Sequence, residues 1–140
     1  MEKITVLLST MIYIGIDCHP TEYTAVAINR FEEEQGMLRF ENTLAGIQEF
    51  LPWIKTVSST QANTIIGLEG GGNNRHGLLA QLVKTYEHIY EVNPLFTKQR
   101  RLLGTKPGKS DPIDAKVIAE VVIKKQGQLP KITKDDRSTV

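Results

Sequence analysis

The sequence has a single cysteine, Cys18, one tryptophan, few aromatic residues and no long hydrophobic run. One cysteine excludes an intramolecular disulfide and fits a reducing compartment such as the cytoplasm. No apolar stretch approaches the ~20 residues that span a bilayer, so we expect no membrane-spanning segment. Residues 1–10 lack the small-residue cleavage site of a secretory signal, and we interpret them as an N-terminal extension.

The chain also lacks a strong charge imbalance, since its formal net charge is +1 over 140 residues. The distribution is less even, because seven basic residues and only two acidic ones fall between Gly71 and Ser110. Such a local excess is typical of a surface that faces phosphates, although a solvated charged face produces the same pattern.

Two kinds of segment alternate along the chain. Short apolar or alternating runs predict strands, and apolar residues at helical spacing predict helices. The predicted strands are 11–17, 22–29, 36–42, 64–70 and 88–92, and the predicted helices are 44–55, 74–86 and 111–125. Thr43 is expected to cap the first helix, and residues 95–103 are expected to form one or two helical turns. The tail 129–140 is polar and shows no core pattern of its own.

The element order is therefore βββαβαβ with a C-terminal helix. Short connections predict that the first three strands form an antiparallel meander, whereas helical crossovers predict parallel neighbours for the later strands. This order predicts an α/β fold with a mixed five-stranded sheet, in the ribonuclease H-like arrangement. We expect the domain to cover residues 11–130.

Two carboxylates stand at strand ends in this arrangement. Asp17 closes the first strand and Glu69 closes the fourth, and these two strands are expected to be parallel neighbours. Both side chains should then emerge at the carboxyl edge of the sheet, where α/β proteins place their sites. His19 has no second histidine or cysteine at metal-ligand spacing, so we expect it in a turn or beside the ligands.

Two further carboxylates, Asp111 and Asp114, begin the last helix. The local pattern alone favours helix capping, because Asp111 precedes Pro112 at the expected first helical position. Residues three apart also share one helix face, so both carboxylates could face the strand ends. The two roles are compatible in one side chain.

Four converging carboxylates repel one another and require a compensating cation. Oxygen-only ligands suit Mg²⁺ or Mn²⁺ rather than zinc. Two such ions can activate an attacking oxygen and stabilise a leaving oxygen at a phosphodiester. The reaction class that the pattern indicates is phosphoryl transfer on nucleic acid.

Four segments together resemble a known family. They are "YIGIDCHPTEYTAVAI", "GLEGGGN", "VNPLFTKQRR" and "KSDPIDAKVIAE", in this order and spacing. They resemble the DEDD-type insertion-sequence transposases of the family numbered one hundred and ten, which are related to the pilin-gene inverting recombinase. The resemblance runs from about Ile12 to Pro130.

This resemblance implies a RuvC-like domain that cuts and rejoins DNA during transposition with Mg²⁺. It implies that the four catalytic and metal-binding residues are Asp17, Glu69, Asp111 and Asp114. It also implies guidance by a structured RNA and action as a homo-oligomer. The residues expected to lie along nucleic acid are Arg75, Lys98, Arg100, Arg101, Lys106 and Lys109.

Full-length members of the family continue into a linker and a second domain with a nucleophilic serine. We therefore expect residues 131–140 to begin that linker, and we expect the isolated chain not to complete recombination. Two other functions remain as alternatives, a Holliday-junction-resolving nuclease and a fragment of an actin-like kinase. A remnant that binds nucleic acid or full-length partners without turnover is a third.

Overall fold

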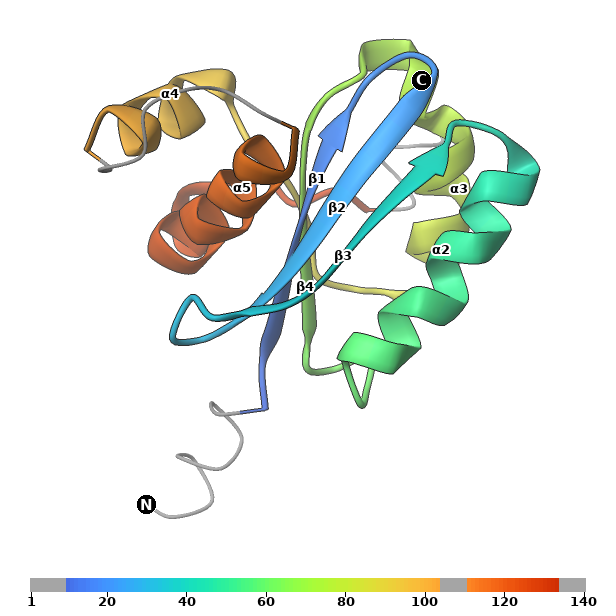
Figure 1. Ribbon diagram of the computed structural model, residues 1–140, viewed down its shortest axis with the longest axis horizontal. Coiled ribbons are helices and arrows are strands. Elements are labelled where there is room, and N and C mark those ends of the chain that lie inside the picture. Colours follow the sequence, from blue (N-terminus) through green and yellow to red (C-terminus); the bar gives the residue numbers. More distant parts are fainter. Residues whose placement is uncertain (1–9, 104–110, 134–140) are drawn as a thin grey trace.

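The computed structural model describes residues 10–103 and 111–133 of the chain. A five-stranded sheet lies in the middle, with helices on both faces (Figure 1). Its strands are β1 (Ile12–Cys18), β2 (Glu22–Asn29), β3 (Glu34–Glu41), β4 (Thr64–Gly70) and β5 (Ile89–Glu91). They lie side by side in the order β3-β2-β1-β4-β5.

The strand directions confirm the predicted mixed sheet. β1, β2 and β3 pair antiparallel, as expected of a meander with short turns. β1 pairs with β4, and β4 with β5, in parallel. β1 and β2 are buried along almost their whole length, because helices cover both faces of the sheet.

Each face of the sheet has its own apolar cluster. One cluster packs beneath α2 (Leu44–Val57) and α3 (His76–Thr85), which follows the short helix η1 (Gly72–Arg75). The other packs beneath α5 (Asp111–Lys125), which lies beside α4 (Pro94–Leu103) and is followed by η2 (Gln126–Gln128). Figure 1 shows the two pairs of helices on opposite sides of the strands.

The helix α2 begins as predicted and ends two residues later than predicted. The Thr43 side chain accepts a hydrogen bond from the Gly46 N–H at 3.0 Å, which confirms the predicted cap. The helix runs past Pro52 to Val57 because Phe50 and Ile54 are buried against the sheet and hold the turns around the proline.

The helix α4 is longer than the one or two turns that the sequence suggested. Its ten residues begin at Pro94, and the Leu95 N–H donates to the Asn93 side-chain oxygen at 2.8 Å. Asparagine followed by proline favours a helix start. The asparagine side chain caps the first turn, and the N–H that proline lacks would have no partner within the helix at that position. Phe96 and Thr97 then pack inward, so the helix gains tertiary support that its polar sequence does not reveal.

Two glycines allow α5 to lie directly against the sheet. Gly15 of β1 and Gly67 of β4 are partners in the parallel register. A Cβ at Gly15 would lie 2.0 Å from the Ala115 carbonyl oxygen, and one at Gly67 would lie 2.4 Å from a methyl of Val122. A side chain at either position would force α5 or its side chains to shift, so the two glycines set the depth at which α5 packs on the sheet.

The end of the described chain lies against the sheet edge. The Ile132 N–H donates to the Ile89 carbonyl oxygen at 2.7 Å, and Leu129 is buried. The predicted tail without a core pattern therefore adds two apolar side chains to the fold, because pairing with β5 brings them inward. The predicted extension, apart from Thr10, and the predicted linker beyond residue 133 lie outside the described residues.

Of the helices that the structure describes, none is both long and apolar enough to cross a membrane.

Candidate metal centre

Asp17 and Glu69 lie side by side at the carboxyl edge of the sheet. They are register partners in the parallel pair of β1 and β4, as the sequence predicted. Each carboxylate lies two residues beyond a glycine that contacts α5, and alternate residues of a strand share one face of the sheet. Both side chains therefore point to the α5 side of the sheet, and Asp17 is buried.

Asp114 comes to the same edge from the first turn of α5. It precedes Ala115, whose carbonyl oxygen lies over Gly15, so the depth of the helix places Asp114 near the ends of β1 and β4. Asp114 is buried, with 9% of its side chain exposed. Asp111 is the first residue of α5, and its side chain lies outside the described part.

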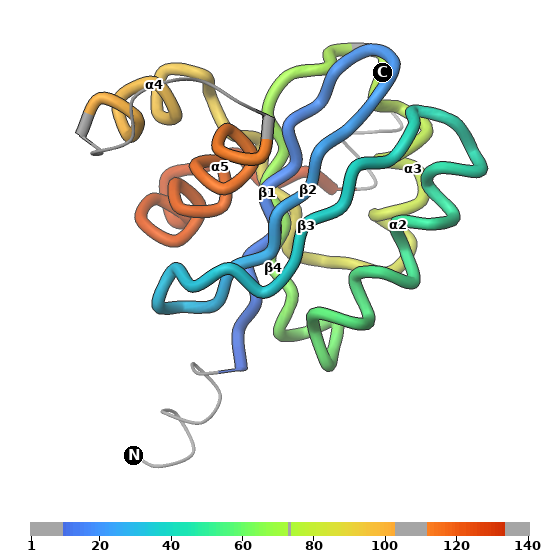
Figure 2. Tube along the Cα trace, in the orientation of Figure 1, coloured from blue at the N-terminus to red at the C-terminus, as the bar shows by residue number. Residues whose placement is uncertain are grey.

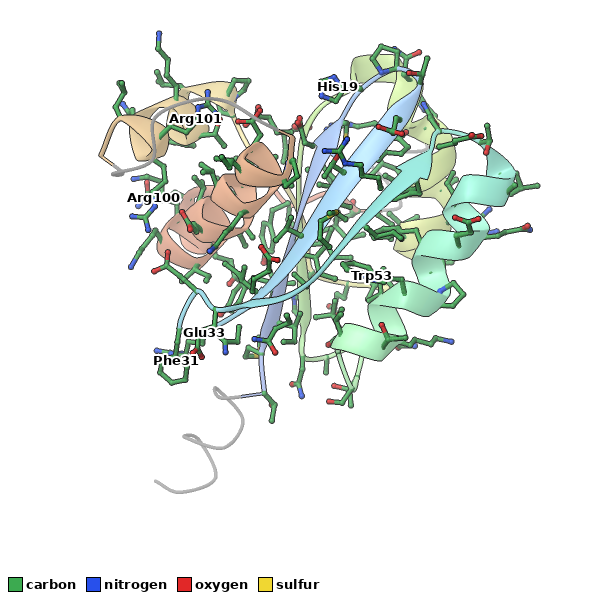
Figure 3. The ribbon with its side chains drawn as sticks, in the orientation of Figure 1. His19, Phe31, Glu33, Trp53, Arg100 and Arg101 are labelled. Carbon is green, nitrogen blue, oxygen red and sulfur yellow. The ribbon has the colours of Figure 1, made fainter. Side chains whose placement is uncertain are left out.

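Each of the three described carboxylates has a partner within the protein. An oxygen of Asp17 lies 3.2 Å from a ring nitrogen of His19 in the β1–β2 turn. The Thr97 hydroxyl donates to Glu69 at 2.5 Å. The Arg101 guanidinium donates to Asp114 at 3.1 Å. Figure 3 shows Arg101 on α4 and His19 at the end of β1, both toward the carboxyl edge.

The carboxylates also act on one another. Burial raises the pKa of the Glu69 carboxyl, and the hydrogen bond from Thr97 opposes that rise. The negative charges of Asp17 and Asp114 raise this pKa further, whereas the positive charge of Arg101 lowers it. The three carboxylates and one guanidinium therefore share a single electrostatic environment.

Cys18 lies beside this group without joining it. Burial raises the pKa of its thiol to about 12, so the sulfur stays protonated at neutral pH. A protonated thiol is a poor metal ligand, and Cys18 instead packs as a small buried residue in the cluster beneath α2 and α3.

The residues present fit a divalent metal ion in chemical type and in location. Their donors are carboxylate oxygens, which suit Mg²⁺ and Mn²⁺. Within the part of the chain that the structure describes, however, no three or more His, Cys, Asp or Glu side chains are arranged to hold a metal. Arg101 and Thr97 each donate a hydrogen bond to one carboxylate oxygen, on Asp114 and Glu69 respectively.

The β1–β2 turn and the loop after β4 meet at this edge. Gly70, Gly71 and Gly72 all have positive φ, and a Cβ on Gly71 would lie 2.8 Å from the Cβ of Cys18. Figure 2 shows the chain passing through both connections side by side at the top of the sheet. The loop after Glu69 thus lies against the end of β1, next to the turn that carries His19.

Of the basic residues predicted to line nucleic acid, the arginines form ion pairs with acidic side chains, whereas Lys98 forms none with the described residues. Arg75 is held by Glu91 and by the Gly70 carbonyl oxygen, and 13% of its side chain is exposed. Arg100 bridges Glu32 and Glu120 at 2.7 and 3.1 Å.

Lys98 differs from these arginines. It is exposed on α4 and forms no ion pair with any residue that the structure describes. Lys106 and Lys109 lie outside the described residues.

Sequence reasoning missed Thr97, Gly15 and Gly67 as parts of this site. A signal for the glycines was present, because Gly-Ile-Asp and Gly-Leu-Glu place a glycine two residues before the carboxylate in both strands. A signal for Thr97 was weaker. It lies four residues before Arg101, so the two share a helix face once α4 is recognised from its Asn-Pro start.

Comparisons with known proteins agree with this geometry. The chain matches the family of DEDD-type transposases of the IS110 insertion sequences, described as "Transposase", over residues 14–140. A search of the curated proteins found no match.

Among solved structures, the fold is similar to RuvC of T. thermophilus in complex with a Holliday junction substrate. The TM-score is 0.59 at 15% sequence identity, and the similarity covers 87% of this chain and 99% of the RuvC chain. At that identity the likeness shows the ribonuclease H-like fold, whereas the family is shown by the match over residues 14–140. The chain belongs to the DEDD-type transposases of the IS110 family, of which it forms a ribonuclease H-like domain.

Proposed function

We propose that this domain performs metal-dependent phosphoryl transfer on DNA, with Mg²⁺ or Mn²⁺ held by Asp17, Glu69, Asp111 and Asp114. The observation that carries the proposal is the parallel register, which places Asp17 beside Glu69 at the edge that Asp114 also reaches. DEDD-type transposases and RuvC-like nucleases generally use divalent metals, which supports the same assignment.

The protein's own contribution is to hold these carboxylates in position. Thr97 is fully buried, and its hydroxyl fixes one oxygen of Glu69. Gly15 and Gly67 seat α5 so that Asp114 reaches the strand ends. When bound, divalent ions would activate the attacking oxygen and stabilise the leaving oxygen of the phosphodiester.

The proposed substrate is DNA, and the proposed assembly includes a structured guide RNA and more than one copy of the protein. Lys98 is exposed and supports phosphate contact, which positions a strand without reading its sequence. Branched DNA is the form to test first, because the RuvC structure was solved with a Holliday junction.

Metal titration tests the site directly. We expect Mn²⁺ to bind the domain, as measured by calorimetry, and Asp17→Asn, Glu69→Gln and Asp114→Asn each to weaken binding about tenfold or more. Glu49→Gln is the matched control, since Glu49 is an exposed carboxylate on α2, on the opposite face of the sheet. Equal Mn²⁺ affinity in Asp17→Asn, Asp114→Asn and the unmodified chain would contradict the site.

Substrate class is tested separately with the same variants. We expect Mg²⁺-dependent cleavage or strand transfer on a four-way DNA junction that Asp17→Asn abolishes. Binding of ATP with no affinity for DNA or RNA would contradict the proposal and favour a kinase-like function instead.

A further inference from the structure

Two side chains of α4 contact two different carboxylates of the candidate site. Thr97 donates to Glu69, and Arg101, one helical turn later, donates to Asp114. The spacing of four residues places both on one face of the helix. α4 is therefore part of the site, although it carries none of the four predicted metal ligands.

The two contacts differ in how they bear on a metal ion. Thr97 is neutral and buried, and its hydroxyl also contacts the Pro94 carbonyl oxygen at 2.9 Å. It can keep its bond to Glu69 while the other carboxylate oxygen faces a ligand. Arg101 instead brings a full positive charge to Asp114.

A divalent metal and the Arg101 guanidinium compete for the same negative charge. Asp114 is almost fully buried, so water screens little of the repulsion between two cations placed on its carboxylate. Arg101 donates to an oxygen of Asp114 at 3.1 Å, so a metal ion that binds this oxygen must displace the guanidinium.

The surroundings of Arg101 permit an exchange by side-chain movement alone. Arg100, the preceding residue, is fixed by Glu32 and Glu120, and Thr97 is buried. These bonds anchor α4, so the helix need not move when Arg101 turns away. The side chain of Arg101 is 26% exposed, which gives it a path toward solvent.

We propose that Arg101 is the counter-cation of the metal-free site, that a divalent metal displaces it from Asp114, and that the freed guanidinium then binds a DNA phosphate. This inference rests on the proposed function and adds an order of events to it. Lys98 lies three residues before Arg101 on the same helix, so the two cations can contact one strand together.

If Arg101 only supported the structure of the site, its removal would weaken Mn²⁺ binding. Displacement of Arg101 by the metal predicts instead that its removal strengthens Mn²⁺ binding. Arg101→Gln should bind Mn²⁺ about fivefold or more tightly, because the competing charge is gone. It should also melt at a lower temperature than the unmodified domain when no metal is present. Lys84→Gln is the matched control, since it removes one exposed charge from α3, and it should change neither quantity.

Arg101→Lys guards against a variant that fails to fold, because it keeps the charge at the same position. It should bind Mn²⁺ more weakly than Arg101→Gln does. Equal or weaker Mn²⁺ affinity in a folded Arg101→Gln variant would overturn the exchange while leaving the metal site intact. No Mn²⁺ binding by the unmodified domain would instead overturn the proposed function, and the exchange with it.

The coupling to DNA is measured with a fluorescently labelled four-way junction. Mn²⁺ should raise the DNA affinity of the unmodified domain more than that of Arg101→Gln, and by reciprocity DNA should raise its Mn²⁺ affinity. An equal effect of Mn²⁺ on DNA affinity in both proteins would overturn the phosphate contact by Arg101.

Discussion

Burial beside two other carboxylates makes the ionised form of Glu69 unfavourable in the folded domain. Its carboxyl is half-buried beside Asp17 and Asp114, and its pKa lies above the ordinary value of 4.5. The folded chain therefore holds a proton on Glu69 more tightly than the unfolded chain does. Stability that comes from this group is present at low pH and is lost as the pH rises through the folded-state pKa.

Glu69→Gln should accordingly stabilise the metal-free domain at neutral pH. The amide oxygen can still accept the bond from Thr97, and the negative charge is gone. We expect the melting temperature to rise by about 2–5 °C, which corresponds to ~1 kcal/mol in a domain of this size. Melting curves from pH 4 to 8 check this expectation.

The advantage of the glutamine should shrink as the pH falls and vanish below 4.5, where the wild-type carboxyl becomes protonated in both the folded and the unfolded state. Glu49→Gln, which removes one carboxylate from the exposed surface of α2, is the matched control. A constant difference at all pH values would mean that the charge of Glu69 is not its cause.

Thr97→Val isolates the hydroxyl that holds Glu69. Valine has nearly the same shape, so the buried pocket stays filled while one charge-assisted hydrogen bond is lost. We expect a loss of about 1–2 kcal/mol in urea unfolding at pH 7 and weaker Mn²⁺ binding. Thr56→Val is a close control, because its hydroxyl also contacts a carbonyl oxygen three residues earlier but lies exposed. Similar losses in both variants would argue against a role for Thr97 at Glu69.

Some residues of the site could be predicted from the sequence around them, whereas others are brought there only by tertiary packing. Asp17 and Glu69 stand out because a carboxylate that ends an apolar strand needs a partner, and sequence shows both the strand and the charge. Their partners on α4 could not be predicted this way. Thr97 and Arg101 reach the site only because α4 packs beside α5, and that packing is not encoded in local spacing.

Among the helices and strands, the depth at which α5 packs on the sheet determines where Asp114 lies. Gly15→Ala should lift the helix, because the new methyl would lie 2.0 Å from the Ala115 carbonyl oxygen and 2.5 Å from the Ala119 nitrogen. We expect a loss of about 3 kcal/mol in denaturant unfolding. Mn²⁺ affinity should fall as well, although every carboxylate is retained, because Asp114 moves with the helix.

Gly77→Ala provides the contrast within an exposed helical turn. Its added methyl would lie 3.7 Å from Ile47, an ordinary contact, so alanine should stabilise α3 by about 0.5–1 kcal/mol. Unchanged metal affinity in Gly15→Ala would show that the position of α5 does not control the site.

The elements themselves were mostly predictable, and the exceptions have physical reasons. β2 and β4 have the predicted bounds, since their apolar runs are closed by turn residues on both sides. α3 begins two residues later than predicted because η1 occupies the turn after the glycines. α4 was underestimated because its sequence has few apolar residues, and its stability comes from the Asn93 cap and from contacts across α5.

Across the whole molecule, ion pairs neutralise much of the positive charge that the sequence suggested for the surface. All three arginines that the sequence placed along nucleic acid are bound to acidic side chains in the described structure. Counting charges along a sequence cannot reveal this, because the acidic partners Glu32, Glu91 and Glu120 come from distant segments. The pairs of Arg100 also connect α4, α5 and the β2–β3 turn into one body.

The salt dependence of DNA binding distinguishes free cations from paired ones. Lys98→Ala should weaken binding alike for all sequences and reduce the slope of log K against log[salt] by about 0.9, the value of one lost phosphate contact. Arg75→Ala should leave that slope unchanged, because its guanidinium is engaged by Glu91 and Gly70. It should instead cost about 1–3 kcal/mol of folding stability, since Glu91 loses its partner. A slope that falls equally in both variants would mean that Arg75 leaves Glu91 to bind DNA, and that the basic surface extends to the loop after β4.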